Sequence, residues 1–185
     1  MNVTPRLALG FWNAWLLCAP MVALGVLVVL PRKALAKRLS DMTDYGTAEK
    51  GFTVAASLLP YFFIAAAAWT PLPPTGPRLI AGLLVSAFGT LGFFRTLRVF
   101  AKAPPDQLLV TGPFQISRNP LYVSAALAFL GACLASGSPL LSSLLLVLLV
   151  LQHRMILAEE RACARRYGDA YAAYARHTAR YLGWG

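Results

Sequence analysis

Charged residues are scarce in this chain of 185 residues. Asp, Glu, Lys and Arg together make up 13% of it, whereas hydrophobic residues make up 58%. An ordinary water-soluble domain carries about 25% charged residues. The composition therefore excludes a typical soluble domain and predicts a protein that lies in a membrane.

Acidic residues are the scarcer charges, with seven Asp and Glu against seventeen Lys and Arg and a net charge of +10. A basic chain can bind nucleic acid, but here the basic residues stand between long apolar runs. That pattern is typical of the positive-inside bias of membrane proteins and of contact with anionic lipid. We therefore expect the lipid bilayer as a partner and expect no nucleic acid.

The chain also lacks the common signatures of soluble enzymes. It has no G-x-G-x-x-G, Walker loop, H-E-x-x-H or G-x-S-x-G sequence, which excludes the usual nucleotide, zinc-protease and hydrolase templates. Its three cysteines, Cys18, Cys133 and Cys163, are too far apart for a metal-binding cluster or an obvious disulfide framework. We expect no metal site and a packing role for the cysteines.

Long apolar runs dominate what is present. A bilayer core about 30 Å thick needs about 20 apolar residues of helix. Runs near that length predict an all-α integral membrane bundle of five transmembrane helices. They are Leu7–Leu30, Phe52–Trp69, Leu79–Phe94, Leu121–Ala135 and Leu140–Ala158. Only residues 136–139 separate the last two, which predicts a helical hairpin, with the fourth helix beginning near Asn119.

The charges predict the topology. Fifteen of the seventeen basic residues and all seven acidic residues fall in the first loop, the third loop and the C-terminal tail. These segments therefore belong on the cytoplasmic side, with the N-terminus outside and the C-terminus inside. We divide the chain into residues 1–94, with the first three spans, and residues 95–185, with a cytoplasmic loop, two spans and a cytoplasmic helical tail. A bacterial inner membrane is the expected location.

Two charged stretches carry the candidate chemistry. In the first, Arg118 and Asn119 precede Pro120, at the start of the fourth helix. Pro suits a first helical turn and Asn is a good N-cap. A helix start with a neighbouring Arg is suited to a carboxylate or phosphate. From position alone, an interfacial Arg bound to lipid headgroups is the simpler explanation of the pattern.

The second stretch begins with Glu159 and Glu160 at the end of the fifth span. They stand among several arginines, and the simplest interpretation is a set of helical salt bridges. A cation-binding pair is the alternative. His153 lies on the same helical face as Glu160 and is a candidate base. Beyond them, Tyr167, Tyr171 and Tyr174 recur at helical spacing, and Gly168 and Asp169 predict a break in this tail.

Together the two stretches resemble the isoprenylcysteine carboxyl methyltransferase and phospholipid methyltransferase superfamily. The first motif is a Gly-Pro-aromatic turn followed by Arg-His/Asn-Pro-x-Tyr. The second is a Glu pair, an aromatic-Gly pair, two tyrosines and an Arg. The residues that carry the resemblance are Gly112, Pro113, Phe114, Arg118, Asn119, Pro120, Tyr122, Glu159, Glu160, Tyr167, Gly168, Tyr171, Tyr174 and Arg180.

The resemblance implies a methyltransferase that uses S-adenosylmethionine, bound between the last two spans and the tail. The lipophilic acceptor, an isoprenylcysteine-type carboxylate or a lipid amine, would enter from the bilayer. Arg118, Asn119, Glu160 and Arg180 would be catalytic. The cofactor-binding set would be Leu109, Val110, Gly112, Pro113, Arg118, Asn119, Pro120, Tyr122, His153, Glu159 and Glu160. Arg118 would face the carboxylate of the donor, and Glu159 or Glu160 its cationic groups.

Two other functions remain open at this point. A sterol-type membrane reductase has a similar C-terminal pattern but uses NADPH, and such enzymes are usually longer with more spans. A non-catalytic membrane scaffold or small transporter is the other. The spans carry no ionisable residue at mid-membrane of the kind that a transport pathway usually needs.

Overall fold

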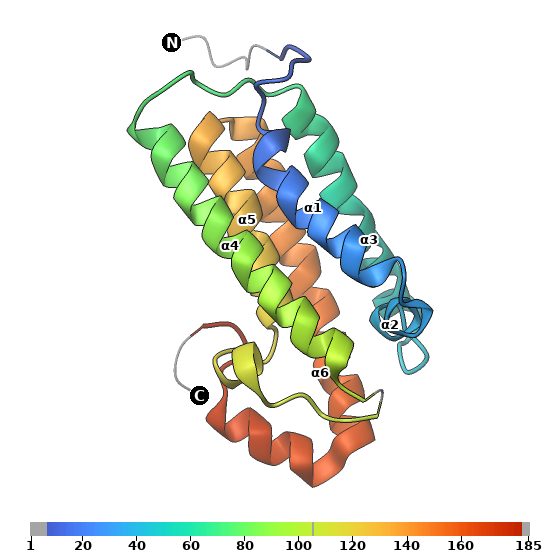
Figure 1. Cartoon of the computed structure of the whole chain (residues 1–185). Coiled ribbons are helices and arrows are strands. Elements are labelled where there is room, and N and C mark those ends of the chain that lie inside the picture. The colour runs from blue at the N-terminus through green and yellow to red at the C-terminus, as the bar shows by residue number, and fades with distance from the viewer. Residues whose placement is uncertain (1–6, 105, 183–185) are drawn as a thin grey trace.

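Apolar helices run between the two ends of the molecule. The computed structural model describes residues 7–104 and 106–182, so the outermost parts of both predicted units lie outside the described residues. Within these ranges the fold is all-α and contains no β-sheet (Figure 1). The elements are α1 (Trp15–Val29), α2 (Lys33–Leu39), α3 (Thr47–Ala68), α4 (Pro77–Lys102), the 3-10 turn η1 (Gly112–Gln115), α5 (Pro120–Ser136) and α6 (Pro139–His177).

Three of these helices, α3, α4 and α6, are long and apolar enough to cross a membrane. Helix α1 reaches that length only together with α2, from which a bend of 118° separates it. Helix α5 is apolar but has 17 residues. The described residues therefore supply three or four candidate spans, and the five-span count stays a prediction.

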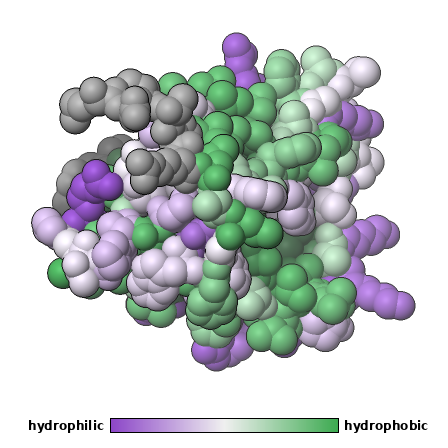
Figure 2. All heavy atoms as spheres, turned by 90° about the horizontal axis from the view of Figure 1, so that it is seen from above, coloured by the Kyte–Doolittle hydropathy of each residue, from purple (hydrophilic) through white to green (hydrophobic). Residues whose placement is uncertain are grey.

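The outer surface of the bundle is apolar. Large hydrophobic side chains point outward from α3, α4 and α6, including Phe62, Phe88 and Leu146, which are each more than 60% exposed. Figure 2, which views the molecule from above, shows a broad area of hydrophobic residues, with hydrophilic side chains projecting at the periphery. Continuous apolar surface of this extent marks contact with lipid. The protein is therefore an integral membrane protein.

The predicted start of the first span at Leu7 is wrong. Residues 7–14 are not helical, and α1 begins at Trp15. The preceding segment packs against the end of α3, where the Ala8 amide donates to the Trp69 carbonyl at 2.9 Å and Asn13 Nδ2 donates to the Ala68 carbonyl at 2.7 Å. The last carbonyls of a helix lack partners within it, so this segment satisfies α3 instead of extending α1.

The third predicted span ended too early. Helix α4 continues to Lys102, and Thr96 and Leu97 are buried in its last turns. Arg95 and Arg98 therefore lie on a helix and not in a loop as predicted. The apolar run ends at Phe94, but packing and not hydropathy decides where this helix stops.

Helices α4 and α5 approach each other closely through small residues. A Cβ atom added to Gly89 would lie 2.4 Å from the Ala128 amide nitrogen, and one added to Gly131 would lie 2.5 Å from the Gly82 carbonyl oxygen. In a membrane, small residues at a helix interface let two backbones touch and gain dispersion energy. This contact fixes where the first turn of α5 stands.

The last helix changes direction at Gly168, whose backbone is non-helical (φ 51°, ψ −126°). The predicted break at this position is therefore confirmed. Beyond it the chain turns under the bundle, and the Tyr174 hydroxyl donates to the Phe114 carbonyl at 2.6 Å. The charged segments, including α2 and the end of α6, gather at one end of the bundle (Figure 1).

Candidate functional site

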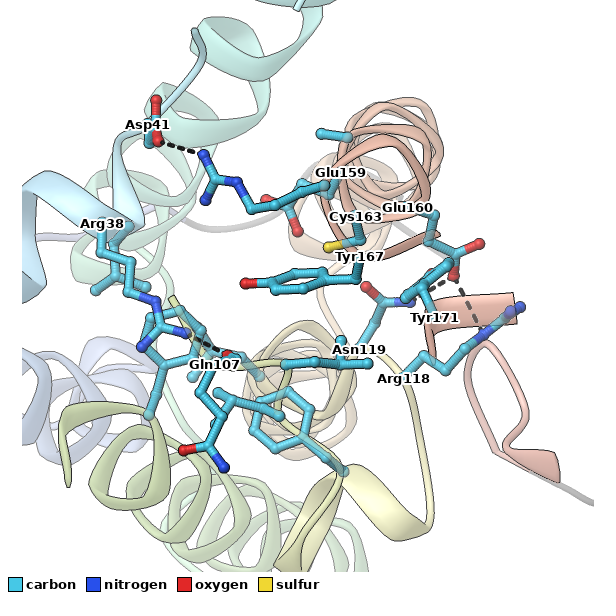
Figure 3. A pocket seen from close by; sticks show the side chains of 18 of the residues that line it. Arg38, Asp41, Gln107, Arg118, Asn119, Glu159, Glu160, Cys163, Tyr167 and Tyr171 are labelled. Atoms are coloured by element: carbon cyan, nitrogen blue, oxygen red, sulfur yellow. Dashed lines mark hydrogen bonds and ion pairs between the residues drawn. The ribbon is translucent and has the colours of Figure 1, made fainter. Parts of the chain in front are cut away.

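A cavity of about 210 Å³ opens at the charged end, between the first turn of α5, α6 and the segment after α2. It lies where the two sequence motifs meet. Figure 3 shows Arg118, Asn119 and Tyr171 on one side of it, Arg38 and Asp41 on the other, and Tyr167 projecting between them. The motifs are far apart in sequence, so tertiary folding alone brings them to this cavity.

The loop before α5 is bound to the end of the tail. The Arg118 amide donates to the Ala179 carbonyl at 2.9 Å, and Ser117 Oγ donates to the Arg180 carbonyl at 3.2 Å. Asn119 Nδ2 donates to the same Arg180 carbonyl at 3.1 Å. These bonds hold the residue range 117–119 against 179–180, which closes one side of the cavity.

Glu160 is the centre of a charged cluster within this contact. Its Oε1 accepts from Asn119 Nδ2 at 2.9 Å and lies 3.5 Å from Arg118 Nε. Its Oε2 accepts from Arg180 Nε at 3.0 Å, with Arg180 Nη2 also at 3.0 Å. The Glu160 side chain is 11% exposed, so two cations compensate a largely desolvated carboxylate. Both of its oxygens are committed to protein partners.

Glu159 has different surroundings although it is the adjacent residue. Its Oε1 accepts a short hydrogen bond from the Tyr122 hydroxyl. None of the ion pairs among the described residues includes it. The residue lies just beyond the apolar part of α6, where burial, with a smaller contribution from the charge of Glu160, raises the pKa of its carboxyl to about 7 against the opposing Tyr122 bond.

The expected capping role of Asn119 is wrong. Asn119 occupies the N-cap position of α5, but its side chain makes no capping hydrogen bond. The side chain is instead taken up by Glu160 and the Arg180 carbonyl. The amide hydrogens of the first turn of α5 therefore keep no side-chain cap and remain available to a ligand.

The structure brings most of the predicted site residues to the cavity but not all. Its lining includes Leu109, Arg118, Asn119, Pro120, Tyr122, Glu159 and Glu160. Arg180 stands behind Glu160 without lining it. Val110, Gly112 and Pro113 are absent from the lining, although their neighbours Leu109 and Phe114 take part in it.

His153 is placed elsewhere. Its Nδ1 lies 2.6 Å from the Tyr181 hydroxyl, and both residues border a second cavity of about 480 Å³. That cavity runs between α5 and α6, with apolar walls that include Leu127, Leu130 and Leu149. Tyr122 lines both cavities and stands between them.

Sequence reasoning missed the wall that the N-terminal half provides. Residues 38–45 line the cavity through Arg38, Leu39, Asp41, Thr43, Asp44 and Tyr45. Nothing in their local pattern distinguishes them from an ordinary charged loop. The tyrosines of α6 did carry a signal, their helical spacing, yet the predicted site left out Tyr167, Tyr171 and Tyr174.

Contacts with α6 and with the turn after α4 hold this N-terminal wall in place. Arg166 Nη2 lies 3.5 Å from Asp41 Oδ2, Arg161 pairs with Glu49, and Arg165 donates to the Asp44 carbonyl. Arg38 lies over the Phe100 ring and donates to the carbonyls of residues 104 and 107 at 3.1 Å. Each contact joins the two halves of the chain.

The donor set suits a ligand that carries both charges. The Tyr171 hydroxyl is buried, belongs to the cavity wall and has no hydrogen-bond partner among the described residues. Arg118 Nε likewise makes no hydrogen bond, but it forms an ion pair with Glu160 Oε1 at 3.5 Å. Buried polar atoms normally find partners, so the Tyr171 hydroxyl marks a place for a polar ligand. Glu159 offers a carboxylate to a cationic group.

Comparison with family models identifies residues 79–170 as a match to the phospholipid methyltransferase family, which confirms the predicted resemblance. The matched segment begins in α4 and ends just after Gly168. Comparisons with curated proteins and with solved structures found no match.

Proposed function

Because residues 79–170 of this membrane protein match the phospholipid methyltransferase family, we propose that it transfers a methyl group from S-adenosylmethionine to a lipophilic acceptor. The observation that carries the proposal is the meeting of both family-like motifs at one cavity. Arg118 and Glu160, from the two motifs, lie 3.5 Å apart there. The cytoplasmic leaflet is the proposed place of the reaction, with the N-terminus outside.

The cofactor would supply an electrophilic methyl group on a sulfonium. The protein needs little covalent chemistry for such a displacement, since orientation of the two partners and exclusion of water supply most of the rate. Arg118 and the free amides at the start of α5 suit the carboxylate of the donor. The Glu160 cluster keeps that helix start fixed against the tail.

The second cavity suits the acceptor. It lies between the apolar parts of α5 and α6, and its polar residues, Gln152, His153 and Tyr181, stand toward its charged end. A hydrocarbon chain of an isoprenylcysteine-type carboxylate or a lipid amine would lie along the apolar walls. Its reactive head would then meet the donor beside Tyr122, the residue that both cavities share.

The direct test is binding of S-adenosylhomocysteine to the purified protein, together with methyl transfer from radiolabelled S-adenosylmethionine into lipid extracts. We expect binding in the parent protein and a loss of at least about tenfold in Arg118→Ala and in Glu160→Gln, because each change breaks the buried charged cluster. Arg95→Ala is the matched control, since Arg95 is exposed on α4 and lines neither cavity.

A well-folded sample that binds no S-adenosylhomocysteine at millimolar concentration would contradict the proposal. Thermal stabilisation by NADPH in its place would favour the sterol-type reductase. If cells keep the protein's function with Arg118 and Glu160 both replaced, a non-catalytic scaffold becomes the better explanation.

A further inference from the structure

Two adjacent glutamates at the cavity differ in what compensates their charge. Glu160 is enclosed by Arg118, Arg180 and Asn119. Glu159 has only the Tyr122 hydroxyl as a partner, and no described Lys or Arg lies within ion-pair distance of it. A buried carboxylate without a counter-ion is unfavourable, so the position is complementary to a cationic ligand.

Several tyrosines share the cavity with this carboxylate. Tyr122 holds it directly, and Tyr45 and Tyr167 line the same cavity. Figure 3 shows Tyr167 extending into the cavity next to Glu159. Tyr45 is close enough that the charge of Glu159 helps to raise the pKa of its hydroxyl, after the larger effect of burial. A carboxylate among aromatic faces favours weakly hydrated onium cations over ammonium or metal ions.

Tyr45 comes from outside the segment that matches the family, residues 79–170. It follows Asp41 and Asp44, whose contacts with Arg166 and Arg165 fix this stretch against α6. The N-terminal half therefore presents a ring to a site whose other members lie in the C-terminal half. Its position depends on those contacts and not on the local sequence.

We infer that Tyr45 completes, with Tyr122, Tyr167 and Glu159, a subsite that binds the sulfonium group of the methyl donor. The inference rests on the proposed function. It assigns the cationic end of the donor to Glu159 and not to Glu160, and it makes the N-terminal half part of the donor site. The positive charge of the donor is then what this subsite recognises.

The test compares two ligands that differ by a methyl group and a positive charge. S-adenosylmethionine and the neutral S-adenosylhomocysteine are titrated into the purified full chain and into Tyr45→Leu, Tyr45→Phe and Glu159→Gln. We expect Tyr45→Leu to lower the affinity for S-adenosylmethionine by about tenfold while the affinity for S-adenosylhomocysteine changes little. Tyr45→Phe keeps the ring and should keep the preference, and Glu159→Gln should lose it.

Tyr61→Leu is the matched control, because Tyr61 is 68% exposed on α3 and lines neither cavity. An equal loss of affinity for both ligands in Tyr45→Leu, or no loss for either, would overturn the inference. So would an unchanged donor preference with weaker use of an amine acceptor, which would assign the subsite to the acceptor. No binding of either ligand to the parent protein would overturn the proposed function itself.

Discussion

Glu159 and Glu160 show how two adjacent residues of one helix can have different chemical environments. Successive side chains on a helix point about 100° apart. Glu160 therefore faces the loop and tail that carry Arg118 and Arg180, while Glu159 faces Tyr122 and the cavity. The first carboxylate is fully occupied by protein groups and stabilises the site. The second is the one left for a ligand.

This difference predicts a pH dependence for donor binding. Burial raises the pKa of Glu159 to about 7, and below that pH the carboxyl is neutral and cannot attract a cation. The affinity for S-adenosylmethionine should therefore rise between about pH 6 and pH 8 and then level off, because binding of the cation favours the deprotonated form. Isothermal titration across this range measures it.

The titratable groups that interact with Glu159 are Tyr122, Tyr45, Cys163 and Glu160. A tyrosine ordinarily titrates near pH 10, and burial raises the pKa of Tyr45 and of Cys163, so neither the tyrosines nor the thiol ionise in this range. Glu159→Gln should consequently flatten the profile. The same pH dependence in that variant would show that another group controls binding. S-adenosylhomocysteine, which lacks the sulfonium charge, serves as the reference.

At the scale of the elements, the break at Gly168 matters most for the site. It lets α6 turn so that Tyr171 and Tyr174 reach the cavity from below. With φ at 51° and ψ at −126°, the backbone at this position is one that residues with a Cβ rarely adopt. A straight helix would carry the tail away from Arg118.

We predict that Gly168→Ala destabilises the protein by about 1–3 kcal/mol, the usual cost of a non-glycine residue in a strained conformation. The melting temperature in detergent should fall by several degrees, and the affinity for S-adenosylhomocysteine should fall with it. Gly51→Ala is the control, because Gly51 lies in α3 and a Cβ there meets nothing within 4 Å. Equal melting temperatures for Gly168→Ala and the parent would contradict this account of the break.

At the scale of the whole molecule, two cavities meet at one residue. The polar cavity lies at the charged end, and the apolar cavity extends between α5 and α6, with Tyr122 lining both. This arrangement matches a reaction between a charged donor from water and an apolar acceptor from the bilayer. It predicts that a substitution can weaken the binding of one ligand without weakening the binding of the other.

Ala126→Trp should block the apolar cavity, whose wall includes Ala126. We expect methyl transfer to a lipophilic acceptor to fall by at least about tenfold, since a filled cavity excludes the chain, while binding of S-adenosylhomocysteine stays within twofold of the parent by the same argument. Leu146→Trp is the control, because Leu146 is 64% exposed and outside this wall. A joint loss of donor binding in Ala126→Trp would contradict separate sites.

The sequence by itself determined that the chain is helical and lies in a membrane. Apolar runs of bilayer length require helices, because every backbone amide in lipid must be bonded within its own segment. Pro120 and Gly168 mark a helix start and a break through their own backbone preferences. The two motifs could be recognised in the sequence for the same reason, because each is a short stretch whose residues have a fixed spacing.

The tertiary structure decided where helices end and which residues share the site. Residues 7–14 satisfy the last carbonyls of α3, a contact that hydropathy does not encode. Tyr45 comes to the cavity that Glu159 lines through contacts of Asp41 and Asp44 with Arg166 and Arg165 in the other half of the chain. Glu160 rather than Glu159 receives the arginines because of the direction in which each points. Local sequence fixes an element's conformation, whereas partners distant in the chain depend on how all the elements pack together.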